Sequence, residues 1–537
     1  MAPEQARRMR AVQHKFRMRG LTLNMEALKG VLAFFDNSSS SLNETEALEL
    51  LLTEIDKQAL KSNVVGKEEI EAVLSLLTGL NESDHKQMLR VIDAFQVPRI
   101  SYDSIRKVFH SFIGKLPIHG NAPAKACLYR DRLQLLQQRL LRDKHFAKPA
   151  FGGHGSHSGS CEMTPLQSLV GCTGRRWVMG VISQLEDGHF FLEDLSASIP
   201  VDLICTQHDF LDLPLTCKHK ITTGFFTENS VVVAEGDFQA NGVFQIHTLG
   251  FPPLESREAS LQITAGIDFF GGGVLSSEEI IRLEQLEKRA VNDMFVILSD
   301  VWLDSAETMQ KLEEVLDGYE SVEVVPSLFI FLGNFCSHPC NLAFYNFFEL
   351  RSQFEQLGSS IASRPRIKDA SRFLFIPGPG DPGPANVLPR PALPKFFTDE
   401  ILKHLPNSIF GSNPCRIRFY SQEIVLFRED LQYRMRRSCI CTPSEDETSD
   451  PFEHLIVTIT HQSHLCPLPL TTQPIIWNYD HALSLYPIPH TIILGDRAEQ
   501  KVFHYMGVTC FNPGSFANDG TFVAYRPATR EAEMSSV

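Results

Sequence analysis

FVILSDVWLD, residues Phe295 to Asp304, is the stretch that decides the fold of this 537-residue chain. Its apolar run ends abruptly at Asp300, which is the pattern of a buried strand with a carboxylate at its carboxyl end. Asp304 then precedes Glu307 by three residues, as in a capping box, and Gly318 follows where the helix is expected to end. In α/β sheets, sites form where strands end and the chain turns into helix, so Asp300 is a candidate functional residue.

The same sequence of apolar run and polar end recurs four times downstream. Each run is expected to be a strand that ends in Gly, Asp, Asn or His. The runs and their polar ends are SLFIFLGNFCS with Gly333 and Asn334, SRFLFIPGPGDPGP with Gly378 to Asp381, HLIVTITHQSH with His461 or His464, and HTIILGDRAE with Gly495 and Asp496. Five strands with such ends, in this order, resemble the calcineurin-like metallophosphoesterases. The resemblance implies an α/β sandwich.

That family builds a two-metal centre from Asp-x-His, Gly-Asp-x-x-Asp, Gly-Asn-His-Asp/Glu, a lone His and Gly-His-x-His, because two divalent cations need many oxygen and nitrogen ligands. Here Asp300, Asp381 and one of the two histidines, His464 or His461, remain. The other matching positions, which depart from the family pattern, hold Trp302, Asn334, Ser337, Pro379, Gly380, Asp496 and Ala498. Trp, Pro, Gly and Ala side chains do not ligate metals. The resemblance therefore implies a phosphoesterase skeleton without catalytic residues, metal or cofactor.

The three surviving residues have ordinary structural explanations. Asp300 is suited to cap the segment that follows its strand, Asp381 stands in a Gly/Pro turn where Asp is favoured, and His464 can hydrogen-bond in the core. We expect these roles rather than catalysis, because isolated ligands do not provide the multi-ligand site that metal-dependent hydrolysis requires.

Long strings elsewhere match a narrower group. FFGGG (269–273), FREDL (427–431), SHLCPLPL (463–470) and CFNPGSF (510–516) resemble the B-subunits of eukaryotic replicative DNA polymerases, most closely those of the epsilon type. The resemblance extends from about Asp93 to the end of the sequence. It implies a nuclear, non-catalytic scaffold subunit that binds the C-terminal region of the polymerase catalytic subunit, shares its complex with small histone-fold subunits, and tethers it to the replicative helicase.

Composition constrains the function independently. The formal net charge of −14 argues against a protein that wraps nucleic acid, since such binding depends on Lys and Arg, so we expect contact with DNA to be mainly indirect. The 12 cysteines include no Cys-x-x-Cys pair, which favours reduced thiols in an intracellular protein over a zinc ribbon. No apolar run approaches the length of a membrane span, so we expect no membrane association.

The chain is expected to have four parts. Residues 1–80 carry helical apolar stripes and predict an all-α bundle, which the resemblance identifies as an AAA+ lid-type docking domain. Residues 81–163 are expected to be a helical connector, with a stripe of Met88, Leu89, Ile92 and Phe95, that ends in the linker KPAFGGHGSHSGS. Residues 164–260 contain five strands separated by turn signals, which predicts an OB-fold barrel. Residues 261–537 form the inactive phosphoesterase-like domain.

Two features leave alternatives open. The segment Tyr433 to Glu453 changes from basic RMRR to acidic CTPSEDETSD, which has no large apolar side chain, so we expect a mobile surface loop, with Thr442 and Ser444 as candidate phosphorylation sites. For function, the rivals are an active metal-dependent phosphoesterase or 3′–5′ exonuclease, and an OB-fold module that binds single-stranded DNA. The lost ligands count against the first rival, and the acidic barrel sequence counts against the second.

Overall fold

The protein is described from a computed structural model. The structure describes residues 12–19, 21–24, 27–28, 31, 51–52, 64–66 and 70, and then residues 89–537 except 113, 148–160, 187, 204–223, 341–345, 385, 442 and 444–447. The chain divides into two compact units, Met1–Arg90 and Val91–Val537. The predicted boundaries at residues 80, 163 and 260 stay predictions.

In the first unit, the predicted all-α bundle is not confirmed. Residues 12–18 are helical, and Phe16, Leu28 and Leu51 are among its buried residues. However, strand β1 (Thr22–Leu23) pairs in parallel with strand β2 (Val64–Val65), which adds a small sheet. Most of the predicted helical stripes lie outside the described residues, as does the linker of residues 148–160.

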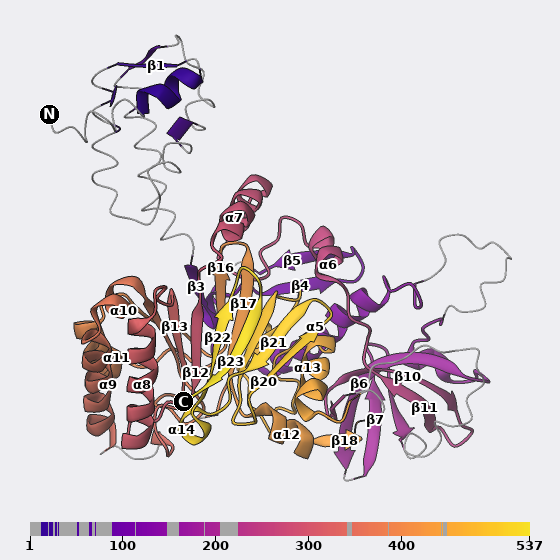
Figure 1. Cartoon of the computed structure of the whole chain (residues 1–537). Helices are drawn as coiled ribbons and strands as arrows, with labels where there is room; N and C mark the ends of the chain where they lie inside the picture. The colour runs from indigo at the N-terminus through magenta and orange to yellow at the C-terminus, as the bar shows by residue number, and fades with distance from the viewer. Residues whose placement is uncertain are drawn as a thin grey trace. The chain divides into compact units, whose positions relative to one another are not determined.

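The second unit contains a closed five-stranded barrel in the order β10-β11-β8-β7-β6, as the sequence predicts for residues 164–260 (Figure 1). β8 and β11 are parallel, and the other neighbours are antiparallel. Apolar side chains on alternate positions fill the interior, including Val232, Phe244 and Ile246. The strands are β6 (Arg176–Glu186), β7 (His189–Glu193), β8 (Ser198–Asp202), β10 (Val231–Phe238) and β11 (Phe244–Gly250).

Beside the barrel lies an α/β domain built on two six-stranded sheets. The first sheet has the order β15-β14-β13-β12-β22-β23, and the strand predicted from FVILSDVWLD is β12, at its centre. Four neighbouring strands are parallel: β12 (Phe295–Ser299), β13 (Leu328–Leu332), β14 (Arg372–Ile376) and β15 (Ser408–Phe410). β22 (Thr521–Arg526) pairs antiparallel with both β12 and β23 (Glu531–Ser536).

The second sheet has the order β20-β21-β19-β17-β16-β3. It packs on the first sheet: Phe295 of β12 meets Phe419 of β16 edge to face, with ring centroids 4.9 Å apart. Its strands are β3 (Leu89–Asp93), β16 (Cys415–Phe419), β17 (Gln422–Arg428), β19 (Thr491–Gly495), β20 (Lys501–Tyr505) and β21 (Val508–Asn512).

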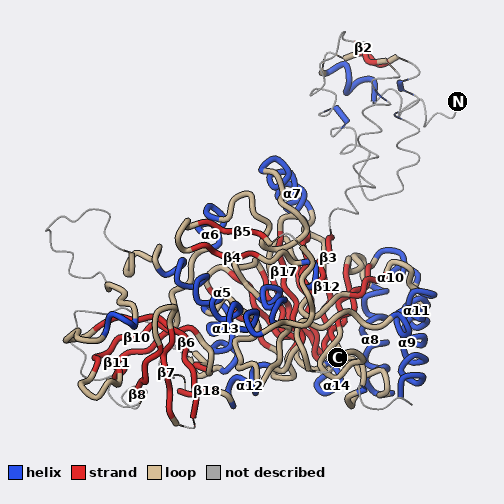
Figure 2. The backbone as a smooth tube through the Cα atoms, turned by 180° about the vertical axis from the view of Figure 1, so that it is seen from behind, coloured by secondary structure: helices blue, strands red, loops and turns tan. Residues whose placement is uncertain are grey.

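Helices cover the outer faces of both sheets (Figures 1 and 2). On the first sheet they are α8 (Ala306–Ser321), α9 (Asn346–Ala362), α10 (Pro365–Ala370) and α11 (Lys395–His404). α8 begins after Ser305, whose hydroxyl accepts from the Thr308 amide, so the predicted cap at Asp304 is displaced by one residue, and the helix continues past Gly318. α12 (Leu431–Arg437) and α13 (Pro451–His461) contribute to the core of the second sheet.

Among the described residues of the helical connector predicted for residues 81–163, the part before residue 122 forms strands rather than α-helix, which corrects the helical prediction there. Leu89 and Ile92 have helical spacing, but they belong to β3, which is an edge strand of the second sheet. A hairpin of β4 (Ile100–Asp103) and β5 (Val108–Ser111) follows, and only then a long helix, α5 (Ala122–Leu140). Pairing with β16 therefore overrides the local helical pattern.

Two further predictions are corrected. HLIVTITH is not a strand but α13, because the Asp450 carboxylate accepts from the Phe452 amide and Pro451 occupies the first helical turn. The expected mobile loop from Tyr433 to Glu453 contains the end of α12, then β18 (Cys439–Cys441), which pairs with β9 (Phe226–Thr227), and the start of α13. Thr442 and Ser444 lie outside the described residues.

The remaining described elements of the second unit are helical. They are the 3-10 helices η1 (Ala94–Gln96), η2 (Leu166–Leu169) and η5 (Trp477–Leu483), and the helices α6 (Arg257–Ile263), α7 (Ser277–Arg289) and α14 (Phe516–Asp519). Within the described residues, no helix has both the length and the apolar content needed to cross a bilayer.

Candidate functional site

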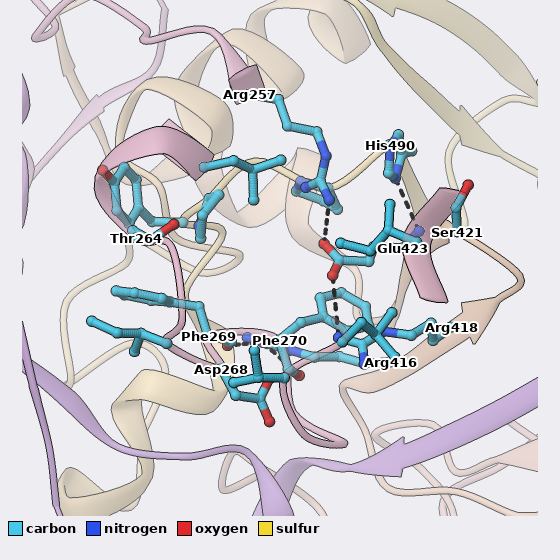
Figure 3. A pocket seen from close by; sticks show the side chains of 18 of the residues that line it. Arg257, Thr264, Asp268, Phe269, Phe270, Arg416, Arg418, Ser421, Glu423 and His490 are labelled. Carbon is cyan, nitrogen blue, oxygen red and sulfur yellow. Dashed lines mark hydrogen bonds and ion pairs between the residues drawn. The ribbon is translucent and has the colours of Figure 1, made fainter. Parts of the chain in front are cut away.

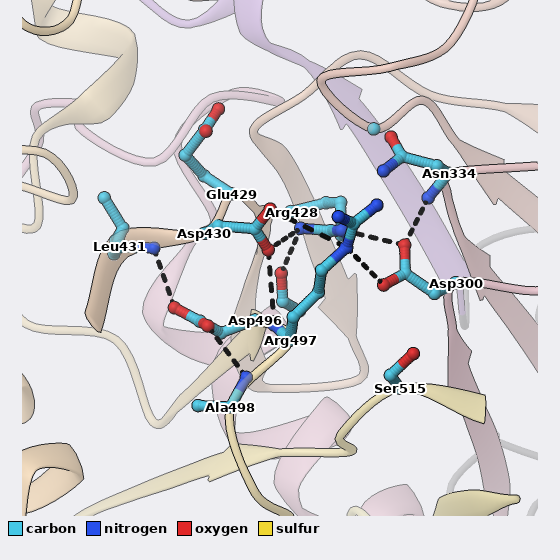
Figure 4. Close-up of polar contacts among 12 residues, drawn as sticks. Asp300, Asn334, Arg428, Glu429, Asp430, Leu431, Asp496, Arg497, Ala498 and Ser515 are labelled. Carbon is cyan, nitrogen blue, oxygen red and sulfur yellow. Dashed lines mark hydrogen bonds and ion pairs between the residues drawn. The ribbon is translucent and has the colours of Figure 1, made fainter. Parts of the chain in front are cut away.

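Asp300 lies at the carboxyl end of β12, as the sequence predicts, and it is 1% exposed. Its backbone φ of +56° is in the left-handed region, which turns the carboxylate toward the neighbouring strand ends. One oxygen accepts from the Asn334 amide at 2.9 Å and from Nη2 of Arg428 at 2.8 Å. The other accepts from Nε of Arg497 at 3.1 Å (Figure 4). Two guanidiniums and a backbone amide thus donate hydrogen bonds to this carboxylate.

Arg428 is the centre of the site. It is the last residue of β17, and its side chain is completely buried. Besides Asp300, its guanidinium donates to the Asp430 carboxylate and the Gly495 carbonyl, each at 2.9 Å, and to the Gly333 carbonyl. Burial lowers the pKa of Arg428, but Asp300 and Asp430 outweigh burial and raise it. The side chain therefore stays a cation between the ends of three strands, β12, β13 and β19.

The charge of Arg428 also fixes the ionisation of Asp300. Burial raises the pKa of the Asp300 carboxyl, but the Arg428 guanidinium next to it and the Asn334 amide bring that pKa below its ordinary value. Asp300 is consequently an ionised carboxylate held in a pair with a fixed cation. Such a group neither accepts a proton near neutral pH nor has free oxygen atoms for a divalent cation.

Asp381 is completely buried in the turn after β14, and backbone amides hold it. Its two oxygens accept from the Phe335 amide at 2.7 Å and the Gly378 amide at 2.8 Å. Burial raises the pKa of Asp381 to about 6 despite these donors. A Cβ atom on Gly333 would lie 1.9 Å from Asp381 Oδ2, so glycine is required where the two turns meet. Asp381 thus links the turn after β14 to the turn after β13 by hydrogen bonds.

The residues at the departing positions of the Gly-Asp-x-x-Asp and Gly-Asn-His-Asp/Glu motifs also make hydrogen bonds within the fold. Oδ1 of Asn334 accepts from the Gly380 amide at 2.7 Å, which joins two of the predicted positions directly. Ser337 donates through its amide, at 3.0 Å, and its hydroxyl, at 2.6 Å, to the carboxylate of Asp304. The carbonyl of Pro379 accepts from Nη1 of Arg390 at 3.0 Å.

Asp496, at the end of β19, caps the neighbouring helix α12. Oδ2 accepts from the amides of Leu431 and Gln432 at 2.7 and 2.8 Å, and Oδ1 accepts from the amide of Ala498 at 3.0 Å. The first two are donors that the start of a helix leaves without internal partners. Burial raises the pKa of Asp496, although the amides oppose this shift. The last of the predicted positions is thus a structural one.

His464 does not join the strand-end site. Its Nε2 lies 3.2 Å from Asp480 Oδ1, and its Nδ1 accepts from the Cys466 amide. Arg132 of α5 pairs with the same Asp480, through an Nε contact of 2.9 Å. Burial and then Arg132 lower the pKa of His464, so the ring is neutral in the core.

The residues present do not fit the two-metal centre of the phosphoesterase resemblance. Both oxygens of Asp300 are taken by cations, and those of Asp381 and Asp496 are taken by amides. The indole nitrogen of Trp302 is buried without a hydrogen-bond partner, at a position where a ligand would be needed. Among the described residues, no group of three or more His, Cys, Asp or Glu side chains is arranged to hold a metal ion.

Sequence reasoning missed the two arginines. Arg428 lies in FREDL, a string used only as a mark of resemblance, and Arg497 stands between two positions that were considered as lost ligands. A side-chain cation appears in no metal-ligand pattern. The available signal was the coincidence of two Arg residues with strand ends whose residues depart from the family's ligand pattern.

Comparison with known proteins identifies the family. The family of DNA polymerase alpha/epsilon B-subunits matches residues 295–504, and the family described as DNA polymerase epsilon subunit 2-like, OB-fold domain, matches residues 122–253. The second match confirms the OB-fold prediction for the barrel. Among solved structures, an archaeal phosphodiesterase is similar over 45% of this chain and 99% of its own, with 10% sequence identity and a TM-score of 0.25.

Curated relatives match over almost the whole chain. The B-subunit of DNA polymerase epsilon from Arabidopsis thaliana is 56% identical, over 98% of this chain and 98% of that protein. DNA polymerase epsilon subunit 2 of Homo sapiens is 36% identical, over 100% of this chain and 99% of that protein, and the corresponding B-subunit from Saccharomyces cerevisiae is 26% identical, over 84% and 76%. With such relatives and family matches in both its barrel and its α/β domain, this chain belongs to the family of DNA polymerase epsilon B-subunits.

Proposed function

We propose that this chain is a non-catalytic accessory subunit of a nuclear DNA polymerase epsilon complex, built on a phosphoesterase-like domain whose metal site has been replaced by arginines. The observation that carries the proposal is the coordination of Asp300 by Arg428 and Arg497. A guanidinium supplies positive charge as a metal would, but it neither lowers the pKa of a bound water nor leaves a coordination position for substrate. The site then stabilises the fold instead of hydrolysing a phosphoester.

The first test is for hydrolysis. The purified full chain is incubated with bis-p-nitrophenyl phosphate and with 3′-labelled single-stranded DNA in the presence of Mn²⁺ or Mg²⁺. We expect no turnover above that of a sample carrying Asp300→Ala. Trp302→His alone should also give none, because the other ligand positions remain filled by non-ligands or occupied by donors. Metal-dependent turnover that disappears in Asp300→Ala would favour the rival proposal of an active phosphoesterase or exonuclease.

The partners are proposed from the family. The barrel and the α/β domain would bind the C-terminal region of the catalytic subunit, in a complex that also holds small histone-fold subunits, and residues 1–80 would tether this complex to the replicative helicase. Internal contacts support a single platform: Gln462, just after α13, receives the Val231 amide of the barrel at 2.8 Å and donates to its carbonyl at 2.7 Å. β9 and β18 add a second connection between barrel and α/β domain.

The second test is coexpression with the C-terminal region of the catalytic subunit. An extensive apolar interface is weakly screened by salt, whereas rim charges are screened over about 10 Å at 0.1 M salt. We therefore expect a complex that persists in high salt and that deletion of residues 1–80 leaves intact. A complex that dissociates in moderate salt, or that requires residues 1–80, would contradict this assignment of the binding surfaces.

A further inference from the structure

A cavity of about 370 Å³ opens between helices α6 and α7, the loop between them, and strands β16 and β17 of the second sheet. Its lining includes none of the residues that contact Asp300, and the proposed function assigns it no role. On its floor, Glu423 accepts from Arg257 at 2.8 Å and from Arg418 at 3.4 Å (Figure 3). Over the whole lining, three carboxylates, Asp268, Glu284 and Glu423, balance three arginines, Arg257, Arg416 and Arg418, so the cavity is not built for a strongly charged ligand.

The wall of the cavity is preformed by FFGGG, the string that begins at Phe269. Asp268 accepts from the amides of Gly271 and Gly273 at 2.7 and 2.6 Å, which holds the glycine loop closed. Gly271 has a φ of +97°, and a Cβ atom there would lie 2.8 Å from a side-chain carbon of Ile92, so only glycine fits this close approach. The Phe270 ring lies near both Arg416 and Arg418, with guanidinium-to-centroid distances of 5.3 and 5.7 Å.

Helix α7, which forms the other wall, is poorly covered. Glu287 is its one buried residue, and its carboxylate receives the Ser421 hydroxyl and the Gln422 amide nitrogen. Ile280 and Ile281 are 38% and 56% exposed, and Val274 and Leu261 at the cavity mouth are 57% and 44% exposed. Isolated helices of this length are marginal in water, and exposed apolar residues that gather around a cavity mark a binding surface.

The charges at the rim indicate what binds there. Glu278, Glu279 and Glu284 are exposed on α7. Glu284 itself lines the cavity. We propose that the cavity and the exposed face of α7 form a docking groove for a segment of a partner protein that inserts an apolar side chain between α7 and Phe269, and that places Lys or Arg residues against these glutamates.

The groove is tested with labelled peptides and the full chain. The probe is a fluorescein-labelled 14-residue amphipathic peptide of Leu and Lys, compared with a version that has Glu for Lys and a version that has Ser for Leu. Fluorescence anisotropy should show binding of the Leu/Lys peptide alone. Ala265→Trp places a large ring at the exposed cavity lining and should weaken binding about tenfold or more, as should Glu284→Lys.

Matched variants on the barrel distinguish peptide binding at the groove from non-specific attraction of a basic peptide to an acidic protein. Leu195→Trp changes a side chain that is 51% exposed, and Glu186→Lys reverses a charge whose side chain is 81% exposed. Both should leave the affinity within about twofold. Equal losses in the barrel and groove variants, or stronger binding of the Leu/Glu peptide, would overturn the proposal. So would sedimentation showing that the chain alone forms a dimer that Ala265→Trp dissociates, since a second copy would then cover the face.

Discussion

Replacement of Arg428 by Met tests the interpretation of the site most directly. Met retains much of the buried volume but removes every donor that Arg428 offers to Asp300, Asp430 and the carbonyls of Gly333 and Gly495. Breaking a buried ion pair from one side costs about 3–5 kcal/mol, and a buried carbonyl that loses its donor costs about 1–3 kcal/mol. We therefore expect Arg428→Met to reduce the free energy of unfolding of the α/β domain by about 4 kcal/mol or more.

The matched control is Arg497→Met. Arg497 binds the same carboxylate at 3.1 Å, but its side chain is 44% exposed, so water screens the pair and we expect a loss of about 1 kcal/mol or less.

The contribution of the Arg428 pair should also depend on pH. Because Asp300 has a lowered pKa in the folded chain, the pair contributes stability at neutral pH, and this contribution is lost as the pH falls through the folded pKa of Asp300. The difference between wild type and Arg428→Met should accordingly become smaller in acid.

The assay is urea unfolding followed by fluorescence. Trp302 lies two residues after Asp300 and reports on this region, once Trp177 and Trp477 are replaced by Phe in all samples. The chain contains more than one folding unit, so the local transition is compared between variants rather than a whole-chain free energy. If Arg428→Met and Arg497→Met unfolded at the same urea concentration, Arg428 would not be the cation on which the site depends.

Other contacts give three further predictions. Burial lowers the pKa of His461 from 6.5 to about 4. The neutral ring's contribution to stability is therefore fully present above about pH 6.5 and is lost as the pH falls toward 4. In His461→Gln, the melting temperature should change less with pH over that range than in the wild type. Gln462→Leu leaves the amide and carbonyl of Val231 without their partners and should destabilise the junction of barrel and α/β domain by about 1–3 kcal/mol, which faster limited proteolysis between the domains would report. Residues 1–80 expressed alone should unfold cooperatively by circular dichroism, and a gradual loss of signal would contradict an independent docking domain.

The contrast between β12 and α13 shows which secondary structure the local sequence pattern could predict. FVILSDVWLD has an apolar run of strand length followed by polar residues, and its strand is where the sequence predicts it. HLIVTITH is equally apolar, but every residue of α13 from Phe452 to His461 except Glu453 is buried, so no polar face reveals the helical period. A helix that is buried on all sides gives the same apolar sequence pattern as a buried strand, and only tertiary packing decides which of the two forms.

The sequence by itself determined the barrel and the central strands of the first sheet, because strand patterns are local properties, and it also shows that Trp302, Pro379, Gly380 and Ala498 carry side chains that do not ligate metals. The tertiary structure alone decided that Leu89–Asp93 is an edge strand and that Arg428 lies against Asp300, since these depend on contacts between residues far apart in the chain. Asp300 and Arg428 are 128 positions apart, and their charge compensation exists only once β12 and β17 end at the same place.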